Sequence, residues 1–226
     1  MSWNPLQSLS DDQRARLAAF EKELLYLNAR HNLVSHQSVP TFFQRHIVHC
    51  LALSRKRFLP ASSVVDWGTG GGLPAIPLAI AFPEIEFYPV DSAQKKIHAV
   101  RTLVRRLGLH NLHPWHGRAE VWPGQAHYSV SRATTSLRTL WQWHRKARLQ
   151  TPHTSDGSTW TPGVLSLKGG NLTLEMAELT STFPTVQTRI TRLDTLLGTA
   201  FFDGKVLVEL FQGDGRNGNR GLGGIR

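Results

Sequence analysis

The segment "VVDWGTGGGLP" at residues 64–74 constrains the fold of this chain more than any other. Two β-branched apolar residues lead into an aspartate, and four glycines then occupy the five positions from 68 to 72. Glycine has the most conformational freedom to lose on folding, so such a run needs a physical reason. A backbone without side chains can adopt positive φ angles and let a ligand approach closely. The segment therefore predicts a buried strand that ends in a ligand-binding turn.

The apolar pattern on both sides of this turn alternates between strand and helix. The expected strands are residues 63–67, 85–90, 111–115, 127–131 and 163–168, and the expected helices are 73–82, 92–108 and a segment around 137–144. This order indicates right-handed βαβ units and a doubly wound, mostly parallel sheet of the Rossmann-like α/β class. Two later runs, 186–193 and 204–211, are expected to close the sheet as an antiparallel pair.

The first third of the chain has a helical pattern. Ser10 and Gln13 have the spacing of a capping box, and apolar residues follow at helical intervals. Pro40 can occupy the first turn of a second helix, whose apolar side carries Phe43, Ile47, Leu51 and Leu53. We therefore expect a helical extension over 1–60, an α/β domain over 61–211 and a disordered Gly/Arg-rich tail over 212–226.

Composition narrows the class of protein and its partners. The 226 residues include 26 Lys and Arg against 16 Asp and Glu, a formal net charge of +10. Such an excess favours a polyanionic partner, most often nucleic acid, although a general solubility charge is the alternative. Cys50 is the only cysteine and no run approaches a membrane span, so we expect a cytoplasmic protein without disulfides.

The spacing of the glycines decides which nucleotide-like ligand fits. A dinucleotide fingerprint would need a third glycine at position 73, which is leucine, so a nicotinamide dehydrogenase is disfavoured. The observed order is Asp66-x-Gly68-x-Gly70-x-Gly72, and Asp91 closes the second strand 23 residues after Gly68. A carboxylate at that place can accept hydrogen bonds from both hydroxyls of a ribose. This is the spacing of S-adenosylmethionine (SAM) methyltransferases, whereas a plain tight turn would leave Asp91 unexplained.

Asp66 has two possible roles at this stage. Its carboxylate can face the amino-acid end of the ligand, or it can hold the glycine turn through the backbone.

Several short motifs extend the comparison beyond the cofactor turn. They are "NLVS" (32–35), "RHIVHCL" (45–51), "VVDWGTGGGLPAIPLAI" (64–80), "VDSAQKKI" (90–97), "RAE" (118–120), "SRA" (131–133) and "LKGG" (167–170). Their order and spacing, over roughly residues 20 to 180, resemble the bacterial 16S rRNA guanine-N7 methyltransferases, the RsmG or glucose-inhibited division protein B family. Trp67 and His49 depart from the residues that the family usually carries at those positions.

The resemblance implies a site, residue by residue. It implies SAM contacts at Gly68, Gly70, Gly72 and Leu73, the ribose on Asp91, the adenine beside Ala119 and Glu120, and a further site residue at Arg132. Arg132 follows a predicted buried strand, so its charge needs a partner such as a carboxylate or a phosphate. The simpler alternatives are a surface ion pair between Arg118 and Glu120 and a solvated strand end at Lys168.

The substrate implied by the resemblance is 16S rRNA or a precursor of the small ribosomal subunit, bound by a monomer. We expect Arg132, Lys168, Lys95 and Lys96 to contact it. Other cations on the 92–108 helix, and Arg55, Lys56 and Arg57 beside it, are expected to extend this basic surface. The alternatives are a SAM methyltransferase with another RNA, protein or small-molecule substrate, or a non-catalytic RNA-binding protein on the same fold.

The chemistry of N7 methylation asks little of side chains. Guanine N7 carries a free lone pair, so no general base is required and we assign no catalytic residue. His46, His49 and Cys50 share one helical face at a spacing that could bind zinc, but no fourth ligand is evident. We expect these three residues to pack the helix, with no metal bound and no nucleophilic role for Cys50.

Overall fold

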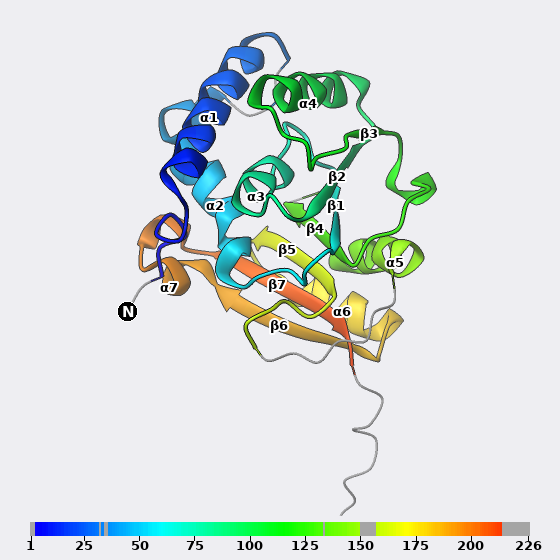
Figure 1. Cartoon of the computed structure of the whole chain (residues 1–226). Helices are drawn as coiled ribbons and strands as arrows, with labels where there is room; N and C mark the ends of the chain where they lie inside the picture. The colour runs from blue at the N-terminus through cyan, green and yellow to red at the C-terminus, as the bar shows by residue number, and fades with distance from the viewer. Residues whose placement is uncertain (1–2, 32, 34–35, 133, 150–156, 214–226) are drawn as a thin grey trace, which may run out of the picture.

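One mixed sheet of seven strands organises the molecule, in the order β3-β2-β1-β4-β5-β7-β6 (Figure 1). The strands are β1 (Ser63–Trp67), β2 (Glu86–Asp91), β3 (Trp115–His116), β4 (Tyr128–Arg132), β5 (Gly163–Gly169), β6 (Val186–Arg192) and β7 (Lys205–Gln212). The first five are parallel, and β7 lies antiparallel between β5 and β6. The computed structural model describes residues 3–31, 33, 36–132, 134–149 and 157–213.

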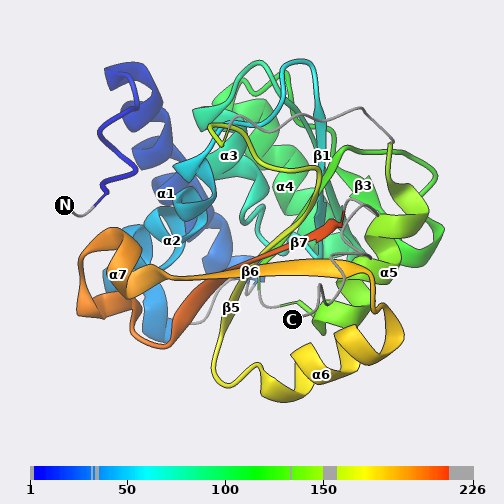
Figure 2. The same ribbon diagram turned by 90° about the horizontal axis from the view of Figure 1, so that it is seen from below.

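Helices cover both faces of the sheet. They are α1 (Asp11–His31), α2 (His49–Leu51), α3 (Ala75–Ala81), α4 (Gln94–Leu107), α5 (Leu137–Ala147), α6 (Thr173–Thr182) and α7 (Leu193–Leu197). Helices α5 and α6 pack together on one face, whereas α1, α2, α3, α4 and α7 lie on the other (Figures 1 and 2). This three-layer arrangement confirms the doubly wound α/β class expected from the sequence.

The two faces have separate apolar cores, and β1 contributes to both. Val64 packs in the core beneath α1 and α3, whereas Val65 and Trp67 pack in the core beneath α5. Successive side chains of a strand point to opposite faces, which explains this division. Asp66, which alternates with Val65 and Trp67, therefore lies on the α3 face and is fully buried.

The N-terminal helices belong to the first of these cores. Leu17, Phe20 and Leu24 of α1 are fully buried in the same cluster as Ile76 of α3. The predicted capping box is confirmed, because Ser10 N–H donates to Gln13 Oε1 at 2.9 Å and Gln13 N–H donates to Ser10 Oγ at 3.2 Å. The division at residue 61 stays a prediction, and the two sides of it share one core.

The second helical segment differs from the expectation. Pro40 lies inside a 3₁₀ helix (His36–Thr41), not in the first turn of the next helix. The chain then forms a π-helix (Phe43–Val48), α2 and another 3₁₀ helix (Ala52–Arg55). All residues from 47 to 53 are buried, so the segment has no polar side from which a single helical period could be recognised.

Strand boundaries agree with the predictions within one residue except at β3. Residues 111–115 do not form a continuous strand: Leu112 makes an isolated parallel bridge to Phe87 of β2, and the regular ladder covers only Trp115 and His116. Asn111 instead turns its buried side chain inward, and its Nδ2 donates to the carbonyls of Ala79, Phe82 and Ile85 at 3.0–3.1 Å. The antiparallel pair is confirmed as β6 and β7, while α6 and α7 were not expected.

Two further predictions concern the ends of the fold and the membrane. Strand β7 continues to Gln212, and residues 214–226 of the predicted tail lie outside the described residues. Among the described residues, none of the helices combines the length and the apolar character that crossing a membrane would need.

Candidate functional site

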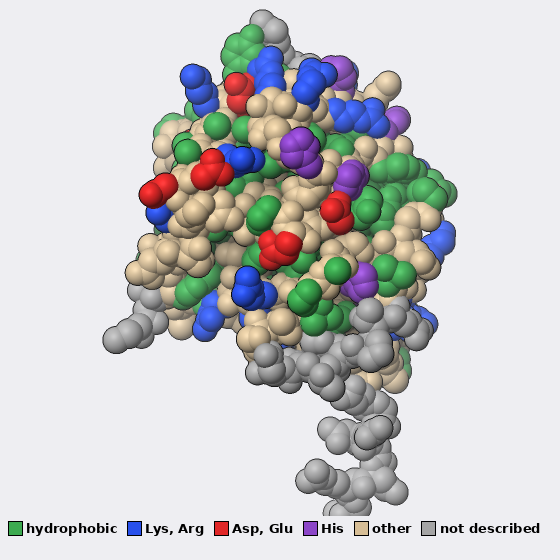
Figure 3. Space-filling model, viewed as in Figure 1, with side chains coloured by type: hydrophobic (Ala, Val, Ile, Leu, Met, Phe, Trp, Pro, Cys, Tyr) green, Lys and Arg blue, Asp and Glu red, His purple; other side chains and the backbone are tan. Residues whose placement is uncertain are grey.

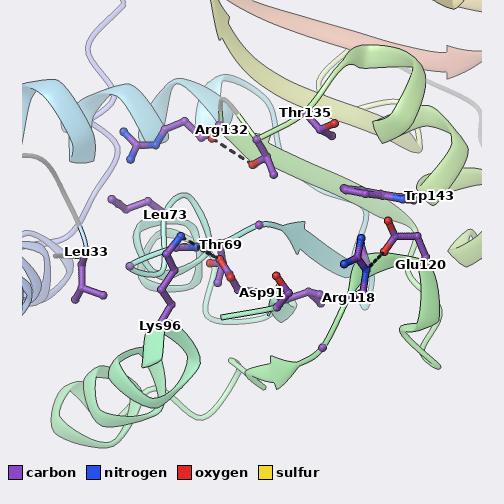
Figure 4. Close-up of a pocket in the computed structure, with 18 residues that line it drawn as sticks. Leu33, Thr69, Leu73, Asp91, Lys96, Arg118, Glu120, Arg132, Thr135 and Trp143 are labelled. Atoms are coloured by element: carbon purple, nitrogen blue, oxygen red, sulfur yellow. Dashed lines mark hydrogen bonds and ion pairs between the residues drawn. The ribbon is translucent and has the colours of Figure 1, made fainter. Parts of the chain in front are cut away.

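A cavity of about 600 Å³ lies where the carboxyl ends of β1, β2 and β4 meet (Figure 4). Ligands of open α/β sheets bind at this edge. Its lining comes from the glycine turn, the end of β2, the segment after β3, the end of β4 and α5, with Gly68, Thr69, Gly70, Gly71, Leu73, Asp91, Ser92, Lys96, Gly117, Arg118, Ala119, Glu120, Arg132, Thr134, Thr135 and Trp143 among its residues.

The glycines of the turn have two different functions. Gly68, Gly70 and Gly72 have φ angles of +70°, +59° and +88°, which side chains rarely adopt. A Cβ on Gly68 would lie 2.2 Å from Thr134 Cγ2, and one on Gly72 would lie 2.4 Å from Ile76 Cδ1. Gly70 is different, because a Cβ there would meet no described atom within 4 Å. Gly68 and Gly72 permit close packing, whereas Gly70 leaves space on the cavity side.

Asp66 holds the turn from beneath. Its Oδ2 accepts hydrogen bonds from Thr69 Oγ1 at 2.6 Å and from Ala75 N–H at 3.2 Å, while its Oδ1 has no partner among the described residues. Burial raises the pKa of this carboxyl to about 7, although both hydrogen bonds act in the opposite direction. Asp66 is not among the residues that line the cavity. The geometry therefore favours the turn-holding role over a ligand contact.

Asp91 is fixed at the mouth of the cavity. Its Oδ2 accepts from Gly70 N–H at 3.0 Å and its Oδ1 accepts from Ala93 N–H at 2.8 Å. Lys96 Nζ lies 3.9 Å from Oδ2. An ionised carboxylate has about four lone-pair sites, so capacity remains for the hydroxyls of a bound sugar. The link from Gly70 to Asp91 also joins the two motifs that the sequence suggested separately.

The segment after β3 forms the opposite wall. Gly117, Arg118, Ala119 and Glu120 line the cavity, and Arg118 Nε lies 3.6 Å from Glu120 Oε2. The predicted surface ion pair is therefore present, and it coexists with the predicted location beside the cavity (Figure 4). The backbone of this wall is held by Gly117 N–H, which donates to the carbonyl of Asp91 at 3.1 Å.

Arg132 lines the cavity from the end of β4, and its partner is a histidine. The guanidinium NH1 lies 2.6 Å from His46 Nδ1, on a segment 86 residues earlier in the chain. Burial, together with the charges of Arg132 and Arg45, lowers the pKa of His46 to about 3. A neutral ring can accept the hydrogen bond at Nδ1, so His46 supplies the partner that the sequence-based argument sought in a carboxylate or a phosphate.

The remaining members of the His46, His49 and Cys50 group serve packing. His49 and Cys50 are buried, and the His49 ring packs against Phe202 with centroids 5.6 Å apart. Burial raises the pKa of the Cys50 thiol to about 12, which disfavours the thiolate that a nucleophile or a metal ligand needs. Among the described residues, groups of three or more His, Cys, Asp or Glu that could hold a metal ion do not occur.

The predicted substrate lysines occupy three different environments. Lys96 lines the cavity and Lys95 is exposed beside it on α4. Lys168 is buried, and its Nζ donates to Thr135 O at 2.5 Å and to Glu175 Oε2 at 2.8 Å. Lys168 therefore does not line the cavity; it holds the β4–α5 loop that does. Lys95 and Gly72 are the other predicted site residues that lie outside the lining.

The basic surface also divides into two parts. Figure 3 shows Lys and Arg side chains gathered at the top of the molecule, over α4, where Lys95, Arg101 and Arg105 are exposed. Arg106 of the same helix is paired with Glu23 at 2.5 Å. Arg55 and Lys56 do not extend this surface as expected, because they line a separate cavity with Trp160 and Arg189. Arg57 pairs with the 157–161 segment instead.

Trp67 changes the packing behind the cavity without entering it. Its ring is fully buried, contacts Trp122 edge-on at 5.4 Å and lies 5.9 Å from Trp143, which lines the cavity. Its Nε1 donates to Ser129 Oγ at 2.9 Å. The departure at this position is therefore accommodated by an aromatic cluster with its polar atom satisfied.

Known structures share the fold of this chain. The O-methyltransferase from Bacillus cereus in complex with SAH has a TM-score of 0.53 and 15% identity, covering 85% of this chain and 91% of that chain. The ribosomal protein L11 methylase from Lactobacillus delbrueckii subsp. bulgaricus has a TM-score of 0.52 and 12% identity, covering 75% and 79%. At such identities the likeness shows the fold alone. That fold is the Rossmann-like fold of SAM-dependent methyltransferases.

Sequence comparison defines the family. The family model described as GidB, rRNA small subunit methyltransferase G, matches residues 13–189. The ribosomal RNA small subunit methyltransferase G of Salinibacter ruber is 48% identical over 209 residues, which cover 92% of this chain and 97% of that relative. The protein of the same name from Cytophaga hutchinsonii is 36% identical over 172 residues, covering 76% and 81%. This chain belongs to the rRNA small subunit methyltransferase G family.

Family membership confirms several expectations from the sequence. The chain is a SAM-dependent methyltransferase of small-subunit rRNA, and the guanine-N7 specificity is that of its family. The individual site residues remain predictions, and the structure brings most of them to one cavity. Thr69, which lies within the glycine turn, was not predicted to contribute to this site, and neither were Trp143 and His46, whose positions depend on contacts between distant segments.

Proposed function

We propose that the cavity beside Gly70 and Asp91 binds SAM, and that its Arg132 end presents N7 of a 16S rRNA guanine for methylation. The observation that carries this proposal is the pairing of open space at Gly70 with a carboxylate already held by backbone N–H groups. We further propose that the protein acts in the cytoplasm, as a monomer, on 16S rRNA or on a precursor of the small ribosomal subunit.

The residues of the cavity fit the cofactor. Asp91 would hold the ribose hydroxyls, Gly68 and Gly70 would lie against the amino-acid part, and Ala119 and Glu120 would flank the adenine. Leu73 and Trp143 add apolar surface to the lining. Glycine at position 70 is required because any side chain there would enter the space that the cofactor needs.

The chemistry requires orientation rather than proton transfer. When bound, SAM supplies an electrophilic methyl group, which guanine N7 accepts through its lone pair without first losing a proton. Holding donor and acceptor at a near-attack distance is therefore the main task of the protein. Arg132 suits the acceptor side, because its planar fork of N–H donors matches guanine O6 or a phosphate. The hydrogen bond to His46 Nδ1 fixes the orientation of this guanidinium group.

The direct test is transfer of a labelled methyl group from SAM to 16S rRNA, comparing the native chain with Gly70→Asp. A carboxylate at position 70 projects into the cavity and repels Asp91, so we expect loss of SAM binding and of transfer. Gly108→Asp is a matched control, because Gly108 also has a positive φ (+60°) and open space but lies at the end of α4. Full activity in Gly70→Asp, or equal loss in both variants, would contradict the proposed cofactor site.

The position of the methyl group needs its own measurement. Mass spectrometry of nucleosides from the methylated rRNA should show 7-methylguanosine. Label in any other nucleoside would overturn the proposed acceptor atom while leaving the cofactor site intact.

A further inference from the structure

Three exposed side chains lie beyond the Arg132 end of the cavity, one from the segment before α2 and two from the turn that leads into β7. The guanidinium carbon of Arg45 lies 5.6 Å from the centroid of the Phe201 ring, and Phe201 is 42% exposed. Lys205 is also exposed, and its Nζ lies 2.7 Å from the point that a Cβ on Gly169 would occupy. We call Arg45, Phe201 and Lys205 the basic–aromatic surface.

This surface is continuous with the proposed acceptor end of the cavity. Arg45 precedes His46, whose ring binds Arg132. In the sheet, Arg132 pairs with Leu167 and Gly169 pairs with Lys205, so Arg132 and Lys205 lie at the same edge. Figures 1 and 2 both show the loop after α7 beside α2, and the ring contact between Phe202 and His49 joins them.

The electrostatics of His49 are consistent with this arrangement. Burial, followed by the charges of Arg132 and Lys205, lowers the pKa of His49 to about 3. Both cations therefore lie close enough to disfavour a charge on this buried ring.

The cations of the surface lack the acidic partners that neighbouring cations have. Within the described part of the chain, neither Arg45 nor Lys205 takes part in a salt bridge, whereas Arg192 nearby is paired with Asp194 and lies 3.6 Å from Asp203. Among the described residues, the polar contact of Arg45 is a hydrogen bond from its Nε to the hydroxyl Oγ1 of Thr41 at 3.4 Å. The charges here are thus available to an anionic partner.

Backbone without side chains leaves room beside these cations. Gly170 and Gly204 have positive φ angles, and a Cβ on either would meet no described atom within 4 Å. Gly170 N–H donates to Gly204 O at 3.2 Å, which joins the end of β5 to the start of β7. An RNA strand that runs from Lys205 towards Arg132 would pass over this glycine backbone.

We propose that the basic–aromatic surface binds an unpaired nucleotide of the RNA close to the guanine being methylated. Its base stacks on Phe201, and its flanking phosphates contact Arg45 and Lys205. This inference rests on the proposed function of the cavity. An exposed aromatic ring with cations that lack acidic partners is the combination used for single-stranded nucleic acid, because every unpaired base offers a face for stacking and every linkage carries a negative charge. A paired base would not expose its face to a single ring.

The first test compares Phe201→Leu with Phe201→Trp. Loss of stacking should raise KM for rRNA about tenfold in Phe201→Leu, since one base–aromatic contact contributes on that order. Phe201→Trp should retain the native KM because it keeps a stacking face. SAM affinity, measured by calorimetry, should not change in either variant. Leu174→Ala, at another exposed apolar residue (85% exposed), should leave KM unchanged.

The second test addresses the phosphates. Lys205→Gln should weaken RNA binding and reduce the slope of log affinity against log salt by about 0.7, the value for one contact with a single strand. Lys22→Gln on α1, also exposed, is the matched control and should leave the slope unchanged. The proposal would be overturned if Phe201→Leu kept the native KM and Lys205→Gln kept the native salt slope. It would also be overturned if Leu and Trp at position 201 changed KM equally.

A third measurement separates this inference from the proposed function. Binding of a fluorescent single-stranded oligoribonucleotide to the full chain needs no methyl transfer. If the native chain failed to methylate rRNA while Phe201→Leu still lost affinity for the oligonucleotide, the proposed function would fail and the RNA surface would stand. If transfer were normal and oligonucleotide affinity were the same in all variants, only the surface would fail.

Discussion

The two ends of the cavity are built in different ways. At the Asp91 end, a continuous piece of about 30 residues supplies the glycine turn, α3 and the carboxylate, and Gly70 N–H bonds directly to Asp91. At the Arg132 end, the site depends on a hydrogen bond from Arg132 to His46 and on the pair of Lys168 with Glu175. The first end is specified by local sequence, the second by packing between distant segments. Cofactor binding and acceptor binding should therefore be separable by mutation.

The largest effect is expected at the Asp91 end. Asp91→Ala removes the acceptor of the ribose hydroxyls and leaves Gly70 N–H without its partner. Two hydrogen bonds to a charged group contribute roughly 3 kcal/mol together, so SAM should bind about 100-fold more weakly. Calorimetry with SAM measures this, and RNA affinity should be unchanged. An equal loss of RNA affinity would show that the two ends are not separable.

Asp66 should make stability depend on pH. Its pKa is about 7 in the folded chain and near 3.8 when unfolded, so the folded state binds more protons between these values. The unfolding free energy should therefore fall as pH rises through this window, by about 2 kcal/mol between pH 5.5 and 7. Denaturant unfolding of the native chain and of Asp66→Asn checks this.

The Asp66→Asn variant mimics the neutral carboxyl and should lose this pH dependence. If its unfolding free energy fell with pH as steeply as that of the native chain, another group would be responsible.

His46 tests the Arg132 end. His46→Ala should lower kcat/KM for rRNA about tenfold, because Arg132 loses a hydrogen bond to its charged group, while SAM affinity is kept. His46→Asn offers an acceptor oxygen and should recover part of the loss. His110→Ala, at an exposed histidine, is the control.

The pH profile distinguishes this role of His46 from acid–base chemistry. With a pKa of about 3, His46 is neutral throughout pH 5–8 and should add no step to the profile. A step near pH 6.5 that disappears in His46→Asn would contradict the neutral acceptor.

The smallest effect is expected on α4. Lys95 is exposed and outside the cavity lining, so Lys95→Gln should weaken rRNA binding only about twofold at low salt and not at all at high salt. Filter binding across a salt series measures this. A tenfold loss would move the main RNA contact from the basic–aromatic surface to α4.

The contrast between the two ends also explains which features of the fold and the site the sequence predicts. The fold class, the glycine turn and Asp91 follow from short-range patterns, because strand alternation, glycine spacing and a strand-terminal acid all lie within one stretch. Lys168 looked like a solvated or substrate-binding cation, but its burial against Glu175 depends on α6, which the pattern did not reveal. The expected strand at 111–115 is reduced to a bridge at Leu112 and a short ladder at Trp115 and His116, and the Asn111 side chain bonds to three carbonyls of another segment. Neither contact leaves a local periodic trace.

The shared core beneath α1 and α3 has a consequence for synthesis of the chain. Translation delivers α1 first, yet the core that buries Leu17, Phe20 and Leu24 is complete only after β1 and α3 have left the exit tunnel. During that interval the nascent chain exposes part of the apolar face of α1, because the rest of the core that covers it has not yet formed. During its own synthesis, this rRNA-modifying enzyme would therefore depend on completion of the following βα unit to bury this apolar surface.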